Sequence, residues 1–265
     1  MGRLKAHIKH YKEYSGIHGM QEDDISRTFK YATDFYLKRL GLIVIFSVPF
    51  ILAFLMPVLV PAPTYLALGG VFLRTGSIPE LSLTDIVITV VAYAIAMFVI
   101  ADTIVNINIV VRSKRTLTAI TNEVFGAMGT YALRIFLIYT CILLALFATQ
   151  ILTYDHPLQS WIYPIVAFAI SFLMFFVPPA VVIDNSGVAS AMKISFEMAL
   201  KNPHFVLIWA FGALLVLSFV KVFGDVVFSN PFSAYFVLLV NCLLVLPFLT
   251  VLQTQMYMEK YPLAR

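Results

Sequence analysis

Charged residues are scarce in this chain. Asp, Glu, Lys and Arg make up 12% of the 265 residues, about half of the ~25% that is usual in soluble domains. Hydrophobic residues make up 61%, and they are gathered in long runs. This balance excludes an ordinary soluble globular protein and is typical of a helical membrane protein.

Recognisable catalytic motifs are also lacking. The five histidines show no HExxH or other metal-ligand spacing. The sequence has neither a P-loop nor a GxGxxG turn, and NSGVAS is not a GxSxG elbow. We therefore expect no cofactor, no metal site and no enzymatic activity. An intramembrane enzyme of an unfamiliar kind is the alternative.

Cysteine is scarce, and we expect no cleavable leader. Cys141 and Cys242 both fall inside apolar runs, so we expect them to be buried thiols. The sequence does not indicate their redox state. The first 40 residues are polar and basic, with no short apolar segment that ends in a small-residue cleavage site. We expect the first long apolar run to act as its own insertion signal.

Six apolar runs are long enough, or nearly so, to cross the ~30 Å hydrocarbon core as helices. The predicted fold is all-α: a basic cytoplasmic segment at 1–25, then a single transmembrane domain at 26–265. Prolines in the first, fourth and sixth runs predict kinks. The runs lie at residues 41–60, 86–111, 135–153, 161–183, 205–222 and 234–254.

The basic residues are distributed very unevenly between the two sides of this topology. Sixteen of the eighteen Lys and Arg residues fall in the N-terminal segment, in the second and fourth connections, at the start of the third run or in the C-terminal tail. The other two, Arg74 and Lys221, belong to the opposite side. The positive-inside rule then places both termini in the cytoplasm of a multi-pass cell-membrane protein. The net charge of +4 needs no nucleic acid partner, and anionic lipid headgroups are the expected neighbours.

A stripe of charged residues recurs just before two of the runs. In both copies Lys, an acid and Lys stand at i, i+4 and i+8, on one face of a helix. A weaker copy around Leu133 and Arg134 precedes the third run. The stripes are Lys30, Asp34 and Lys38, then Lys193, Glu197 and Lys201.

These stripes predict an internal repeat. Each unit would be an amphipathic surface helix, or elbow, followed by two spans, at about 26–115, 116–185 and 186–260, with pseudo-threefold symmetry. The elbows are expected at 26–39, 122–133 and 188–202. The alternative is that polar linkers between spans became amphipathic without a repeat.

The segment FFVPPAVVIDNSGVASAMKISFEMALKNPHFVLIWAFGALL, which begins at Phe175, supports a resemblance. It resembles the membrane domain attached to some glycerophosphodiester phosphodiesterases, and related stand-alone bacterial and archaeal six-span proteins. The phosphodiesterase itself is a separate soluble barrel, for which six spans in 265 residues leave no room. The resemblance therefore implies a membrane module tied to lipid handling or envelope maintenance, and it transfers no catalytic residue.

The second run carries a carboxyl group inside the membrane. Asp102 and Asn106 stand at i, i+4 and share a helix face. A carboxyl there costs ~2.5–3.5 kcal/mol on insertion scales, so it should face protein or a wet cavity. The pair is interpreted either as a substrate or proton site, or as a hydrogen-bonded contact that fixes helix packing.

Polar residues also end the other even-numbered runs. Asp184 and Asn185 end the fourth run and Gln253 ends the sixth, as helix caps or as the rim of a cavity. We expect such a cavity to open to the cytoplasmic side, with an anionic headgroup at its basic mouth. The mouth would be formed by Lys38, Arg39, Arg134 and Lys201.

Two classes of function follow from these observations. The first is transport or handling of a lipid or another hydrophobic anion, with membrane lipids as partners. The second is a non-transporting structural or accessory subunit of a larger complex. A homo-oligomer is compatible with either class.

Overall fold

The structure is a computed structural model that describes residues 22–59, 83–116, 128–154, 156–229 and 232–259. These ranges contain helices and no strand, which confirms the predicted all-α fold. Five helices are long and apolar enough to cross a membrane, and the bent α2–α3 pair makes a sixth if it is counted as one span. The chain is thus a multi-pass membrane protein.

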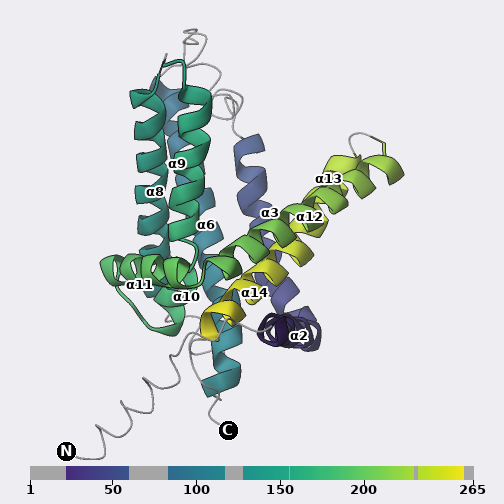
Figure 1. Cartoon of the computed structure of the whole chain (residues 1–265). Coiled ribbons are helices and arrows are strands. Elements are labelled where there is room, and N and C mark those ends of the chain that lie inside the picture. The colour runs from purple at the N-terminus through teal and green to yellow at the C-terminus, as the bar shows by residue number, and fades with distance from the viewer. Residues whose placement is uncertain (1–21, 60–82, 117–127, 155, 230–231, 260–265) are drawn as a thin grey trace, which may run out of the picture.

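The helices match the six predicted runs in order (Figure 1). The odd-numbered spans are α3, α8 and α12, and the even-numbered spans are α6, the broken helix α9–α10, and α13–η2–α14. Here η1 and η2 are π-helical turns. The bounds are α2 (Glu22–Lys38), α3 (Leu40–Leu59), α6 (Leu83–Thr116), η1 (Met128–Ala132), α8 (Leu133–Leu152), α9 (Gln159–Leu173), α10 (Val177–Ile183), α11 (Val188–Lys201), α12 (Pro203–Val227), α13 (Phe232–Val240), η2 (Asn241–Val245) and α14 (Leu246–Met258).

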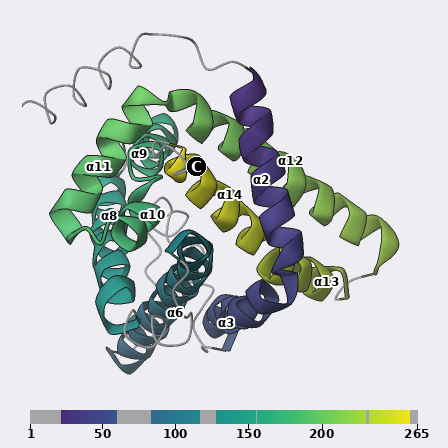
Figure 2. The same cartoon turned by 90° about the horizontal axis from the view of Figure 1, so that it is seen from below.

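The first predicted elbow is a sharp corner in the chain. α2 meets α3 at an angle of 87°, so α2 lies across the end of the bundle while α3 rises from it (Figures 1 and 2). The polar, charged sequence of α2 gives way at Leu40 to the uniformly apolar α3. A helix with one apolar and one charged side is stable along a membrane surface, whereas a uniformly apolar helix is stable across the membrane.

Two of the predicted elbows, α2 and α11, bury the same positions. In each helix the buried residues stand at i, i+4, i+7 and i+8. This spacing is one stripe of an α-helix, and it faces the bundle. The four are Thr28, Ala32, Phe35 and Tyr36 in α2, and Ala191, Ser195, Met198 and Ala199 in α11.

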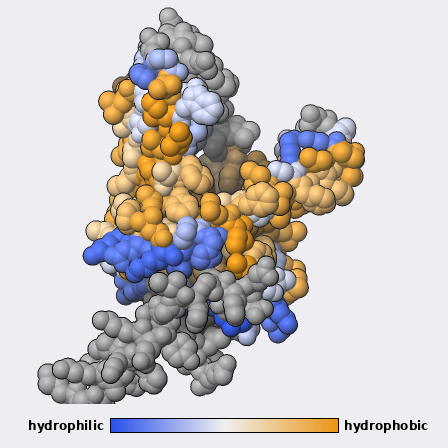
Figure 3. Space-filling view, viewed as in Figure 1, coloured by the Kyte–Doolittle hydropathy of each residue, from blue (hydrophilic) through white to orange (hydrophobic). Residues whose placement is uncertain are grey.

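The remaining surface of each elbow is divided into an apolar and a charged flank. Leu37 of α2 is 64% exposed and Leu200 of α11 is 55% exposed, and each precedes a lysine that ends the charged stripe. Figure 3 shows a hydrophilic band at the level of α11, below the hydrophobic surface of the spans. A helix with these three sides suits the membrane interface, where it meets protein, lipid and water at once.

The second predicted elbow, at 122–133, is described only from residue 128. Residues 122–127 lie outside the described ranges. The described part is the π-helical turn η1, and residues 129–152 form one apolar helix long enough to cross a membrane. This part of the segment therefore continues into the third span.

The fourth span is interrupted just before its proline pair, in line with the predicted kink. Pro178 and Pro179 stand in the first turn of α10, where a missing N–H leaves no bond unmade. The break lies before them, between Leu173 and Val177, and a side chain from α11 bridges it. The Ser195 hydroxyl donates to the Leu173 carbonyl (2.8 Å) and accepts from the Phe176 N–H (3.0 Å).

The elbows pack against the even-numbered spans in a cyclic order. α2 lies on α14, η1 lies on α6, and α11 lies on α10. Side-chain bonds mark two of these contacts. Thr28 donates to Glu259 at the end of α14 (3.0 Å), and Arg112 of α6 donates to the Tyr131 hydroxyl of η1 (3.4 Å). The order is the one expected of three related units, and the internal repeat itself stays a prediction.

The third hairpin diverges from the rest of the bundle. α12 and α13 lean away from α8 and α9, which run side by side (Figure 1). Gly224 of α12 allows close packing within this hairpin, because a Cβ there would lie 2.8 Å from Val237 of α13. The α12–α13 hairpin is therefore tightly packed internally, while its outer faces carry many exposed apolar side chains.

Candidate functional site

The ends of the three even-numbered spans meet at the centre of the protein, near α2 and α11. α6, α10 and α14 all pack on one another there (Figure 2). Ile107, Val181 and Tyr257, one from each, are fully buried. Polar side chains placed in this core need partners, because an unmet hydrogen bond costs about 1–3 kcal/mol.

Asp184 and Tyr257 form one of these polar contacts. The Tyr257 hydroxyl of α14 donates to Oδ2 of Asp184 at 2.6 Å. Asp184 is the C-cap residue of α10. It is not the N-cap of α11, which is Gly187 with no side-chain cap hydrogen bond. The carboxylate joins two spans instead, because α10 ends at Ile183 and turns Asp184 toward α14.

Three further bonds join the same spans. Asn108 of α6 accepts a hydrogen bond from Thr254 of α14. Gln253, predicted as cap or rim, donates to the Phe175 carbonyl in the break between α9 and α10. Arg112 of α6 donates to the Val182 carbonyl of α10 at 2.9 Å. Each pair of even-numbered spans is thus connected by at least one side-chain bond.

Arg134 holds the turn that follows α10. Its guanidinium donates to Oδ1 of Asn185 (3.1 Å) and to the carbonyl oxygens of Asn185 (3.4 Å) and Ser186 (3.2 Å), and it lies 5.8 Å from the centre of the Tyr131 ring. Asn185 has φ 50°, a left-handed conformation that asparagine tolerates better than most residues. The structure therefore brings together two predicted site residues, Arg134 and Asn185, as a structural clamp.

Asp102 and Asn106 form a polar pair whose hydrogen bonds are incomplete. Asn106 Nδ2 donates to Asp102 Oδ2 at 3.0 Å. The Oδ1 atoms of both residues are buried and have no hydrogen-bond partner among the described residues. Two unmet acceptors inside a span can take a proton, a cation or the hydroxyl of a ligand. The pair lines neither of the cavities described below.

The remaining predicted mouth residues lie on separate elements. Lys38 ends α2 and pairs with Asp34 at 2.8 Å, Arg39 is the exposed corner residue, and Lys201 ends α11. The C-terminal ends of α2 and α11 lie apart in Figure 2, beside the starts of α3 and α12 respectively. The residues predicted to form one basic mouth therefore lie at separate places on the face that bears α2 and α11.

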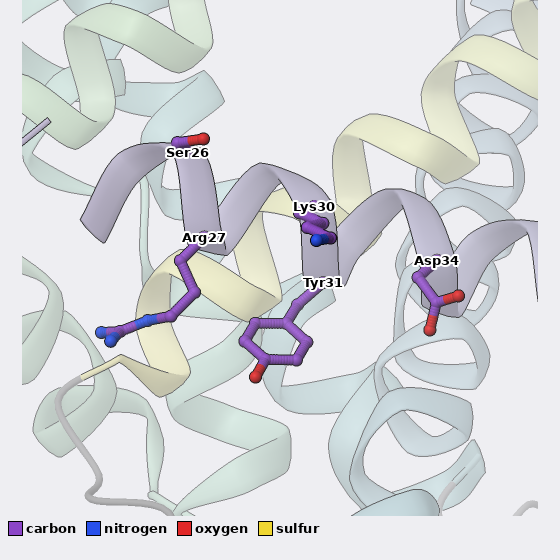
Figure 4. A pocket seen from close by; sticks show the side chains of 5 residues that line it. All are labelled: Ser26, Arg27, Lys30, Tyr31 and Asp34. Carbon is purple, nitrogen blue, oxygen red and sulfur yellow. The ribbon is translucent and has the colours of Figure 1, made fainter. Parts of the chain in front are cut away.

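A niche of about 390 Å³ runs along the exposed side of α2. All of its lining residues come from this helix, and Figure 4 shows Arg27 and Tyr31 extending from the same side of it. The niche holds two cations, a hydroxyl, a phenol and the carboxylate of Asp34, which is paired with Lys38 at 2.8 Å. The lining residues are Ser26, Arg27, Lys30, Tyr31 and Asp34.

Several residues of this region escaped the sequence reasoning. Ser195, Thr254 and Tyr257 are not among the predicted site residues, although all three are fully buried. Ser195 carried a usable signal, because it stands on the buried stripe of α11 four residues after Ala191. Tyr257 carried none, since it lies past the predicted end of the sixth span.

No family model, no curated protein sequence and no solved structure matches the chain. The resemblance to the phosphodiesterase-associated membrane domain therefore stays a prediction. Within the described ranges, no three His, Cys, Asp or Glu side chains are grouped closely enough to hold a metal ion. The interpretation of the site rests on its geometry alone.

Proposed function

We propose that the protein is a membrane-embedded lipid-handling module that binds anionic headgroups at the face formed by α2 and α11. One observation carries this proposal: both elbows divide their surface into a buried stripe, an exposed apolar flank and a charged flank. Such helices lie at the depth of lipid phosphates, with apolar residues toward the acyl chains and lysines toward the headgroups.

The niche on α2 supports the same proposal. Arg27 and Lys30 supply the cations, and the Ser26 hydroxyl supplies a further donor. Arg27 lies 3.7 Å from Glu259, so one carboxylate already shares this surface. Guanidinium has five N–H donors in a rigid fork, which leaves several for a phosphate.

Asp102 and Asn106 are the proposed handling site within the membrane. Their two unmet acceptors lie on one face of α6, before Asn108 and Arg112, the residues that bond α6 to the other even-numbered spans. A lipid hydroxyl, a proton or a cation would satisfy them. We place the headgroup at the elbows and this polar contact deeper in the bilayer.

The face that bears α2 and α11 is assigned to the cytoplasm on the charge bias. A cysteine introduced at Ser229, in the α12–α13 turn, should react with an impermeant maleimide from outside intact cells. A cysteine introduced at Asn202, after α11, should react only once the cells are opened. Both tests use a background without Cys141 and Cys242. The reverse labelling pattern would contradict the assignment.

Lipid retention tests the headgroup proposal. Replacing Lys30 and Lys201 by Gln together should reduce anionic lipid copurifying with the protein, by roughly thirtyfold in low salt. The reason is that each cation near an anionic surface contributes about 1 kcal/mol. The difference should shrink at high salt because of screening. Bound lipid is counted by mass spectrometry after purification from native membranes.

The matched control replaces the same two lysines by Arg, which keeps both charges. It should retain lipid as the unmodified protein does. Loss of lipid in the Arg variant, or unchanged retention in the Gln variant, would count against headgroup binding at the elbows.

An accessory subunit is the second candidate, and the outer surface of the spans favours it. Within its described range α9 has no buried residue, and exposed apolar side chains cover much of α12. Such faces meet either lipid or another membrane protein. Copurification of a stoichiometric partner that covers α9 or α12 would favour this reading over lipid handling.

A further inference from the structure

A second cavity, of about 470 Å³, lies between α3 and the α12–α13 hairpin. It is within the usual size of small-molecule sites. Its walls are apolar except at two points, Lys221 and Asn241. The lining residues are Phe54 of α3, Leu217 and Lys221 of α12, Ala234, Val237 and Leu238 of α13, Asn241 and Cys242 of η2, and Leu246 of α14.

The cavity belongs to the half of the membrane opposite α2 and α11. Lys221 stands six residues, or about 9 Å along the helix, before the end of α12. Asn241 stands nine residues, or about 14 Å, after the start of α13. The cation is therefore nearer the membrane surface and the carboxamide lies deeper.

Asn241 presents an unmet acceptor. Its Oδ1 is buried, with no hydrogen-bond partner among the described residues. It is the first residue of the π-helical turn η2, and such turns are frequent at functional sites. The turn is also bonded to α2, because the Tyr36 hydroxyl donates to the Leu244 carbonyl at 3.1 Å. Burial raises the pKa of Tyr36 to about 12, so this hydroxyl keeps its proton.

Lys221 is available to an anion despite its partner. It contacts Asp225 at 2.8 Å, and Asp225 also accepts a hydrogen bond from Ser233. An ammonium group has three N–H donors, so two remain after the bond to Asp225. The side chain is 57% exposed, and its flexible stem lets the charge reach the membrane surface.

We infer that this cavity binds a single-chain phospholipid that carries an anionic phosphate and a free glycerol hydroxyl. The phosphate lies at Lys221, and the acyl chain lies against Phe54, Leu217 and Leu246. The hydroxyl donates to Asn241 once rotation of this side chain brings Oδ1, which is buried in the unliganded protein, to the cavity. Diacyl phosphatidic acid, in which both glycerol hydroxyls are esterified and the headgroup carries no further hydroxyl, would leave the Asn241 acceptor unmet. The site goes beyond the headgroup binding proposed for α2 and α11, since it lies in the opposite half of the membrane.

The first test compares two probes on the unmodified full-length protein in detergent. These are oleoyl lysophosphatidic acid and its analogue without the glycerol hydroxyl. The hydroxyl form should bind at least fivefold more tightly, because the analogue leaves a buried acceptor without a donor. Equal affinities, or no binding of either probe, would overturn the inference.

Two variants of α12 locate the site. Leu217→Trp fills the cavity and should abolish binding of the hydroxyl form, whereas Leu215→Trp, on the exposed surface of the same helix, should leave it unchanged. Asn241→Leu should remove the preference for the hydroxyl form without changing the affinity for the analogue. Retained binding in Leu217→Trp, or a retained preference in Asn241→Leu, would overturn the assignment.

Discussion

Replacing Tyr257 by Phe is expected to lower the free energy of unfolding by about 2 kcal/mol. The ring stays, so the packing of this fully buried side chain is kept. Only the hydroxyl is lost, and with it the 2.6 Å bond to the Asp184 carboxylate that joins α14 to α10. Hydrogen bonds to charged groups contribute about 1.5–3 kcal/mol. The melting temperature of the purified protein in detergent measures the effect.

The matched control is Tyr235→Phe. Tyr235 is 57% exposed on α13, and loss of its hydroxyl should leave the melting temperature within about a degree, as surface substitutions change stability little. If Tyr257→Phe and Tyr235→Phe melt alike, the contact between Tyr257 and Asp184 does not hold the even-numbered spans together.

Replacing Asp102 by Asn is expected to raise stability while it impairs lipid handling. The substitution keeps shape and removes a charge whose placement in the membrane costs ~2.5–3.5 kcal/mol. We therefore expect a gain of about 1–3 kcal/mol in the free energy of unfolding. A residue that weakens its own fold is characteristic of a functional site. The measurements are a denaturation curve and the native lipid bound to the purified protein.

Thr103→Val is the control on the same helix. Thr103 is buried, and its hydroxyl donates to the Val99 carbonyl within α6, so its loss should leave the bound lipid unchanged. If Asp102→Asn destabilises the protein and leaves its lipids as they were, the pair is a packing contact. The accessory-subunit reading would then be favoured.

The spans and two of the elbows could be predicted because their signals are local. Length and hydropathy define α6, α8 and α12, and the Lys–acid–Lys stripe marks both α2 and α11. The buried stripes Thr28–Tyr36 and Ala191–Ala199 then follow from helical periodicity. The proline pair is also a local signal: it predicted a kink in the fourth span, and the interruption lies just before Pro178.

The contacts that join α6, α10 and α14 could not be predicted, because they link residues far apart in the chain. Thr254 and Asn108 are 146 positions apart, and nothing local to either marks the other. The sequence did single out Asp102 and Asn106, since an acid within an apolar run is conspicuous wherever the run packs. It gave no hint of the cavity at Asn241, which exists only where α3 meets the third hairpin.

The first helix of the described chain packs against the last. α2 lies on α14, Thr28 and Arg27 meet Glu259, and Tyr36 reaches Leu244. During synthesis α2 leaves the ribosome long before α14 exists. The stripe of α2 that is buried in the folded protein therefore stays uncovered until the final span is made. In that interval the stripe can rest only on the bilayer surface or on an insertion factor. A nascent chain that stops before Leu244 would leave the buried stripe of α2 exposed. Quality-control factors could recognise this exposed apolar surface as a sign of an incomplete protein.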